Sequence, residues 1–172
     1  VTITVNPTPA VTVTGNGGFC AGGSTDLTFN MTGTAPFTVS YSDGTDTLTF
    51  TTNNSSFIVN VAPVASTTYT IVSMADNGCA TNNITGANTS VTISVNSLPS
   101  VTMAGDTTLC GVGVASLTFN FDAGTGPFNV TFNDGTTTTN RTFNNGDTIQ
   151  VLPTTTTTYT VTDITDAQGC TA

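Results

Sequence analysis

The stretch STDLTFNM, Ser24–Met31, decides the fold class of this chain. Leu27, Phe29 and Met31 are apolar and the residues between them are polar, so an extended strand would have one apolar face. The pattern returns about ninety residues later as VASLTFNF, Val114–Phe121. Alternation with a period of two, with no helical period anywhere, predicts an all-β protein.

The whole chain repeats with the same offset. Four blocks recur in the same order, with slips of a single residue between them. The first copies are VNPTPAVTVTG (5–15), FCAGGSTDLTFNM (19–31), APFTVSYSDGT (35–45) and STTYTIVSMADNGC (66–79), and the second are VNSLPSVTMAG (95–105), LCGVGVASLTFNF (109–121), GPFNVTFNDGT (126–136) and TTTYTVTDITDAQGC (156–170). Tandem domains explain this order.

Each copy is predicted to be an immunoglobulin-like β-sandwich. About seven short alternating strands fit into each repeat, and Asp43-Gly44 and Asp134-Gly135 supply the turn chemistry of hairpins. We expect repeat 1 to span 7–96 and repeat 2 to span 97–172, the second being incomplete because it stops before its own seventh strand.

The opening residues VTITVN, Val1–Asn6, are nearly identical to VTISVN, Val91–Asn96, which is the predicted seventh strand of repeat 1. We therefore interpret residues 1–6 as the last strand of a preceding repeat. Two explanations stay open. The chain is an excerpt from a longer array, or Val1–Asn6 completes the open sandwich of another subunit by strand addition, pairing beside Thr157–Ile164 of that neighbour.

Composition excludes several classes of function. The chain has a single cation, Arg141, no lysine, no histidine and no glutamate, and its formal net charge is -9. The usual general bases and nucleophile pairs are missing, so we do not expect an enzyme. Nothing neutralises phosphates, which opposes nucleic acid binding. No segment approaches the ~20 apolar residues of a membrane span, so membrane insertion is not expected.

Several blocks resemble a known class of repeats. They are FCAGGSTDLTF (19–29), GTAPFTVSYSDGT (33–45), TTTTTYTVTDITDAQGC (154–170) and the proline linker VNPTPA (5–10). They are similar to Ig-like repeats of very large cell-surface proteins of flavobacteria and related Bacteroidota, including gliding-motility adhesins of the SprB type. The resemblance implies export by the type IX secretion machinery and display at the cell surface as long arrays, without catalytic residues.

Four cysteines, two in each copy, fit an oxidising extracellular setting. The simple interpretation pairs Cys20 with Cys79 and Cys110 with Cys170 inside each domain. Its weakness is that the two cysteines of one repeat are expected at opposite ends of the strands. A strand of about eight residues separates its ends by roughly 26 Å, whereas a disulfide needs Cα atoms within about 7 Å. The alternative bonds Cys20 to Cys170 across the domain junction and leaves Cys79 and Cys110 for neighbours.

Metal and sugar sites are weaker predictions. Asp43 and Asp46 offer oxygen ligands to Ca2+, and Asp163 and Asp166 form a similar weak pair, but for the first pair a plain hairpin turn is the favoured interpretation. We expect no other cofactor or metal. Threonines in Asp-Thr motifs, which resemble the O-glycosylation signal of Bacteroidota, and asparagines in Asn-x-Ser/Thr sequons are the modification candidates: Thr47, Thr107, Thr148, Asn30 and Asn129.

The function expected from these features is structural and adhesive. Two Ig-like domains would form part of an extracellular stalk or filament, with neighbouring repeats as partners and surface glycans or other cells as its targets. The alternatives are a carbohydrate- or receptor-binding module, and a filament subunit assembled by strand complementation. Against sugar binding, the chain has no Trp and only 3 Tyr. Tyr69 and Tyr159 are placed either at a tyrosine corner or as ordinary core aromatics.

Overall fold

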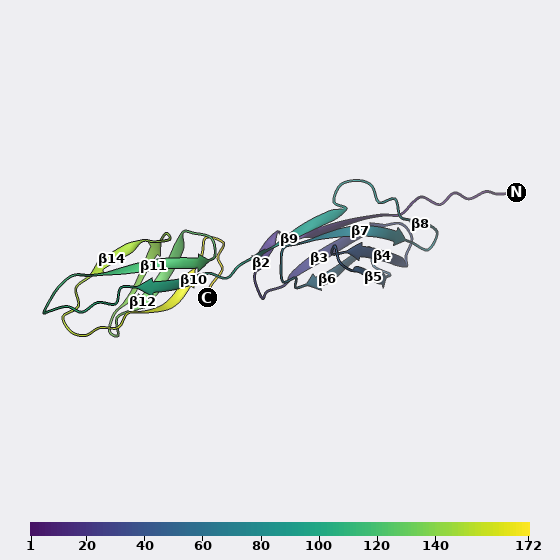
Figure 1. The fold of residues 1–172 in the computed structure, drawn as a ribbon. Coiled ribbons are helices and arrows are strands. Elements are labelled where there is room, and N and C mark those ends of the chain that lie inside the picture. The colour runs from purple at the N-terminus through teal and green to yellow at the C-terminus, as the bar shows by residue number, and fades with distance from the viewer. The chain divides into compact units, whose positions relative to one another are not determined.

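The computed structural model describes all 172 residues and is all-β, with no helix. It divides into two compact units, unit 1 (Val1–Val95) and unit 2 (Asn96–Ala172). This division falls one residue before the boundary expected from the repeats. Each unit consists of two packed β-sheets (Figure 1), so the predicted immunoglobulin-like sandwich fold is confirmed.

Unit 1 contains all seven strands predicted for a repeat, and two short strands that the alternation does not reveal, β2 and β8. The strands are β1 (Ala10–Gly15), β2 (Gly18–Cys20), β3 (Thr25–Thr32), β4 (Phe37–Ser42), β5 (Thr47–Thr52), β6 (Ser56–Val61), β7 (Thr67–Ala75), β8 (Ala80–Thr81) and β9 (Ser90–Asn96). One sheet has the order β1-β3-β6 and the other β2-β9-β7-β4-β5, with β8 paired to β7.

The core of unit 1 forms where the apolar faces of its two sheets meet. Leu27 and Phe29 of β3 are fully buried and Met31 is nearly so, as their alternation predicts. Phe29 packs on Tyr41 of the opposite sheet with ring centroids 5.1 Å apart. Each such side chain contributes about 1.5–3 kcal/mol when it is buried fully. The pattern in STDLTFNM therefore both selects the strand and supplies the core.

Unit 2 repeats this arrangement with six strands. They are β10 (Ser100–Ala104), β11 (Ala115–Ala123), β12 (Phe128–Asn133), β13 (Thr138–Phe143), β14 (Thr148–Val151) and β15 (Thr160–Thr165). Its sheets have the orders β10-β11-β14 and β13-β12-β15. No strand of unit 2 corresponds to β9, which confirms that the second sandwich lacks its last strand within this chain.

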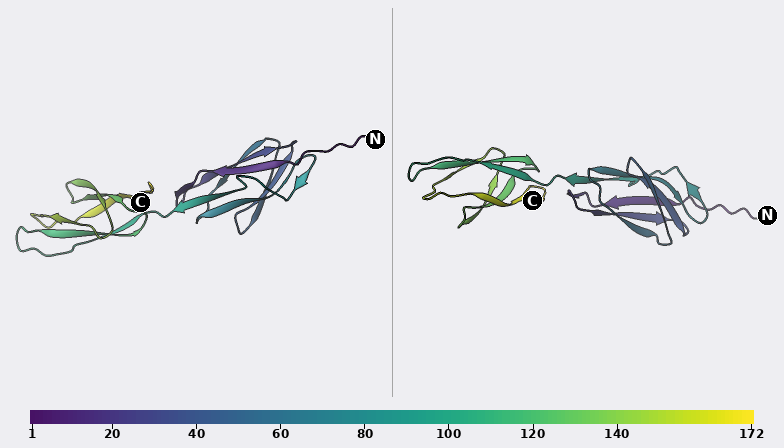
Figure 2. Two further views of the ribbon diagram at one scale, coloured as in Figure 1. Left: turned by 90° about the horizontal axis from the view of Figure 1, so that it is seen from above. Right: turned by 60° about the horizontal axis from the view of Figure 1, so that its bottom comes forward.

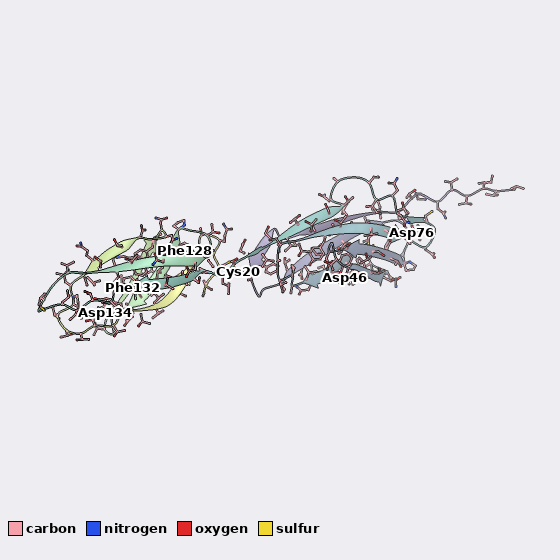
Figure 3. The ribbon with its side chains drawn as sticks, viewed as in Figure 1. Cys20, Asp46, Asp76, Phe128, Phe132 and Asp134 are labelled. Atoms are coloured by element: carbon pink, nitrogen blue, oxygen red, sulfur yellow. The ribbon has the colours of Figure 1, made fainter.

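Stacked phenylalanines fill the core of unit 2. Phe119 is fully buried and stacks on Phe143 with ring centroids 4.1 Å apart. Phe128 stacks on Phe121 at 4.0 Å, and Phe128 and Phe132 project from β12 into the same core (Figure 3). A second aromatic cluster therefore holds the two sheets of this unit together.

The first six residues, Val1–Asn6, are in no strand and are exposed. In the views of Figure 2 this segment leads away from the strands of unit 1 toward the N-terminus. Its assignment to a preceding repeat stays a prediction. No helix of the chain has the length and apolar character needed to cross a membrane.

Candidate functional site

The four cysteines are in two different states. Cys20 and Cys170 are disulfide-bonded, whereas Cys79 and Cys110 carry free thiols. The intradomain prediction, Cys20 with Cys79 and Cys110 with Cys170, is therefore wrong, because each of those bonds would need a cysteine that is free. The bonded residues are the two named by the interdomain alternative, which also left Cys79 and Cys110 unpaired within this chain.

The register of unit 1 explains why Cys20 and Cys79 are not bonded. Cys20 ends β2, which adjoins β9, and Ile93 of β9 pairs with Thr67, the first residue of β7. Cys79 follows Ala75, the last residue of β7. A strand of nine residues places its ends roughly 26 Å apart. Cys20 and Asp76, which holds the Cys79 turn, accordingly lie toward opposite ends of unit 1 (Figure 3).

The turn that carries Cys79 is built around the carboxylate of Asp76. Its Oδ1 accepts hydrogen bonds from the backbone N–H groups of Gly78 (2.8 Å) and Cys79 (2.7 Å), and its Oδ2 accepts one from Thr34 (2.8 Å). These donors, Thr34 first, hold the pKa of Asp76 below its ordinary value. One ionised side chain therefore fixes the cysteine turn and ties it to the β3–β4 connection.

Unit 2 builds the same turn around Asp166, a carboxylate that is only 6% exposed. Its Oδ1 accepts from the N–H groups of Gln168 and Cys170, both at 2.9 Å, and its Oδ2 accepts from Thr125 at 2.9 Å. Burial raises the pKa of Asp166, but the hydrogen bonds from Thr125 and the cysteine turn outweigh it, so the pKa lies below its ordinary value.

Asp163 and Asp166 have different surroundings in the structure. The two residues are a candidate calcium pair by sequence, but Asp163 is exposed on β15 and Asp166 points its oxygens at backbone donors. The structural role of Asp76 and Asp166 is not among the predictions made from sequence. The signal was present, because each aspartate precedes Gly-Cys at matching positions of the two repeats.

Removing the charge of Asp166 should destabilise unit 2. Asp166→Asn keeps the shape but weakens hydrogen bonds to an ionised acceptor, so we expect the free energy of unfolding to fall by about 2 kcal/mol at pH 7. Because the folded pKa of Asp166 is depressed, its contribution is present above the ordinary pKa near 3.8 and is lost as pH falls through the folded value. Urea unfolding at several pH values measures this.

The matched control for that experiment is Asp163→Asn, which removes the same charge from an exposed position on β15. Its free energy of unfolding should change by less than about 0.5 kcal/mol. Equal effects of the two substitutions, or a difference from wild type that does not shrink as the pH falls below 3.8, would contradict the role given to the Asp166 carboxylate.

The Asp43 turn is a hairpin between β4 and β5, as the simpler interpretation has it. Oδ1 of Asp43 accepts hydrogen bonds from the N–H groups of Thr45 (2.9 Å) and Asp46 (2.8 Å). Asp134 makes the same bonds in unit 2 without a second carboxylate in its turn. No group of three or more metal-binding side chains occurs in the structure. Calcium binding by Asp43 and Asp46 stays a prediction.

The modification candidates all lie on the surface. Thr47 and Thr148 are exposed at the first residues of β5 and β14, and Thr107 is exposed between β10 and β11. The sequon residues Asn30 and Asn129 are exposed as well. A glycan at any of these side chains would extend into solvent, so exposure permits their modification. The modification itself stays a prediction, and the intact mass of the native protein tests it.

The two tyrosines proposed for a corner differ from each other. Tyr69 is 5% exposed and packs against Tyr41 with ring centroids 6.4 Å apart. Burial raises the pKa of Tyr69. Tyr69 therefore belongs to the core of unit 1, and a corner role for its hydroxyl stays a prediction. Tyr159, at the matching position of unit 2, is only half-buried.

Two features therefore recur in both units. Each unit has one cysteine toward each end of its sandwich, and an aspartate turn holds the second of these cysteines in place. Disulfide bonding at Cys20 and Cys170 indicates an environment outside the reducing cytosol. No protein-family model matches the chain, and no curated protein is significantly similar to it.

Proposed function

We propose that this chain is a non-catalytic structural and adhesive module of a long extracellular stalk or filament. The observation that carries the proposal is repetition. Two sandwiches of one fold follow each other directly, and each has one cysteine beside its first strand connection and another in an aspartate-held turn at the opposite end. Such a design supports a chain of domains rather than a single reactive centre.

The disulfide state supports a reinforced stalk. Cys20 and Cys170 are the two disulfide-bonded residues of a chain with four cysteines, and they belong to successive repeats. We take them to be bonded to each other. A bond of that kind restricts rotation about the linker between the repeats, and it needs an oxidising compartment such as the cell surface. Export by the type IX secretion machinery is part of the proposal.

A stalk is favoured over a carbohydrate-binding module. Sugar sites commonly use an exposed aromatic ring as a platform. The large apolar side chains that are exposed here are all aliphatic, and the aromatic residues of both units lie in or against the cores. Contact with glycans or other cells would then depend on other parts of an array or on many weak contacts along it.

The experiment is immunogold labelling of intact source cells with antibodies raised against the 172-residue protein, together with a glycan array of the same protein. We expect gold particles along fibres that project from the cells, loss of label after external protease, and no glycan bound by the isolated protein. Label confined to the cell interior would overturn the proposal. A strong, specific glycan signal would favour the binding module.

A further inference from the structure

Unit 2 has an open groove beside the start of β15. Its volume is about 650 Å³, and its lining combines the apolar residues Met103, Leu117, Val151 and Tyr159 with backbone around Gly105 and the threonine run 154–158. Every lining residue belongs to unit 2. The groove therefore lies within one sandwich, between the β10-β11-β14 sheet and the β15 edge.

In unit 1 the corresponding space is filled by β9. Ile93 is fully buried there, and its Cδ1 lies 2.9 Å from the point where a Cβ on Gly15 would stand. The strand pairs with β7, Ile93 opposite Thr67 and Val91 opposite Tyr69. Gly15 and Tyr69 correspond to Gly105 and Tyr159, which line the groove of unit 2.

The strand that would receive a partner is shorter in unit 2. β7 has nine residues, and β15 has six. The missing residues are Thr157–Tyr159, and their counterparts Thr67–Tyr69 are the residues that pair with β9. Val161 is half-buried where Ile71 is 4% exposed. Both the backbone edge and the core of unit 2 thus leave space for one more strand.

The same chain carries a segment that fits this space. Val1–Asn6 reads VTITVN, and β9 contains VTISVN, so the two differ only by Thr4 for Ser94. Val1, Ile3 and Val5 alternate with threonines and are almost fully exposed, Ile3 at 85%. The segment leads away from the strands of unit 1 (Figure 2). A segment of exposed alternating apolar residues and an open sheet edge are the two components that strand addition requires.

We propose that Val1–Asn6 of a second copy of this chain docks in the groove of unit 2 as its missing strand. In the register of β9, Ile3 of the donor copy lies opposite Thr157 and Val1 opposite Tyr159, and the Ile3 side chain enters the space beside Gly105 and Leu117. The contact is head-to-tail, so each copy both gives and receives a strand, and copies add into a filament. This deepens the proposed function and rests on it.

The free cysteines fit the same head-to-tail contact, an observation independent of the groove. On the donor copy, the thiol of Cys79 lies 3.8 Å from the carbonyl oxygen of Asn6, at the end of the docking segment. On the acceptor copy, Cys110 corresponds to Cys20, which lies on β2 beside the end of β9. Docking therefore brings Cys110 of one copy toward Cys79 of the next. Cys110 occupies the repeat position of Cys20, and Cys79 occupies that of Cys170, so the pair matches the two bonded cysteines.

A disulfide between Cys110 and Cys79 needs an oxidant, and a small disulfide such as oxidised glutathione supplies it. The thiolate of one cysteine attacks this disulfide, forms a mixed disulfide and releases one small thiol. The thiolate of the other cysteine then attacks the protein sulfur and releases the second small thiol. Two protein thiols are oxidised, one small disulfide is reduced, and the two protons go to the departing thiolates.

Light scattering of the 172-residue protein over a range of concentrations tests the docking, first with Cys79 and Cys110 reduced. We expect association that grows with concentration. Ile3→Asp should weaken it at least about tenfold, because this substitution places a charge in an apolar site. Thr4→Asp is the matched control, since it adds the same charge at the position of the exposed Ser94. A synthetic VTITVN peptide should raise the melting temperature of the Ile3→Asp protein, and a VTDTVN peptide should not.

Oxidised glutathione then tests the cysteine contact. Non-reducing peptide mapping should find Cys79 linked to Cys110 in a ladder of oligomers, and a mixture of Cys79→Ser and Cys110→Ser proteins should give the mixed dimer in preference to either homodimer. Equal effects of Ile3→Asp and Thr4→Asp, a protein monomeric at millimolar concentration, or links joining Cys79 to Cys79 would overturn the proposal. The immunogold labelling of cells does not depend on any of these outcomes. The docking can therefore be wrong while the proposed function stands, and the reverse.

Discussion

Pulled from its two ends under oxidising conditions, the protein should yield almost none of the length stored between Cys20 and Cys170. If these two bonded cysteines are partners, the load passes through their disulfide and bypasses every strand after β2, from β3 to β15. A reductant should release about 150 residues, which at roughly 3.5 Å per extended residue is about 500 Å of contour length. Single-molecule force spectroscopy with and without a thiol reductant measures this difference.

Two cysteine variants make that experiment specific. Cys170→Ser removes one of the bonded residues, so the protein should extend fully even in an oxidising buffer. Cys79→Ser changes a free thiol and should leave the shielded length intact. Full extension of the unsubstituted protein without reductant would show that Cys20 and Cys170 are not joined to each other, and the reinforced stalk would lose its main support.

Shielding of this kind would matter for a stalk. An immunoglobulin-like domain that unfolds under load exposes its core and its strand edges, and both favour aggregation. A disulfide between successive repeats would keep the load off the strands that lie between its two cysteines. The missing lysine gives this bond further weight, because internal lysine-asparagine isopeptide bonds, which rigidify some bacterial adhesin stalks, have no lysine here. Covalent reinforcement has to come from cysteine.

The sequence predicts the sandwich well because one physical signal dominates it. Alternation in β3 and β4 places Leu27, Phe29 and Val39 in the core, and all three are fully buried. Repetition then transfers the prediction to unit 2. β2 and β8 escape this reasoning, since strands of three and two residues are too short to show a period.

The cysteine pairing was harder to predict because it depends on the order of strands along the sheet. Two cysteines in one repeat suggest one bond, yet β7 separates the two ends where Cys20 and Cys79 lie. The register of β7 and β9 places Cys20 and Cys79 at opposite ends of unit 1, too far apart for a disulfide. The role of Asp76 and Asp166 was hidden for a related reason, since their donors Thr34 and Thr125 lie about forty residues earlier in the chain.

Truncation of Ile93 should have the second large effect, and it measures how much the last strand contributes to a sandwich. Ile93 is fully buried against Gly15 and Leu27, so Ile93→Ala removes core contacts and leaves a cavity. Such substitutions cost about 2–5 kcal/mol. Hydrogen exchange of the amides in β7 and β9 should accelerate by about thirtyfold or more, while amides of β11 and β12 in unit 2 exchange at their former rates.

Ser94→Ala is the control on the same strand, because Ser94 is exposed. Exchange in β7 should change by less than threefold in that variant. The result bears on assembly as well, since Ile3 is proposed to occupy in unit 2 the site that Ile93 occupies in unit 1. Exchange that is the same in the Ile93→Ala and Ser94→Ala proteins would mean that this site binds its isoleucine weakly, and an Ile3 docked in the equivalent groove could not then hold two copies together.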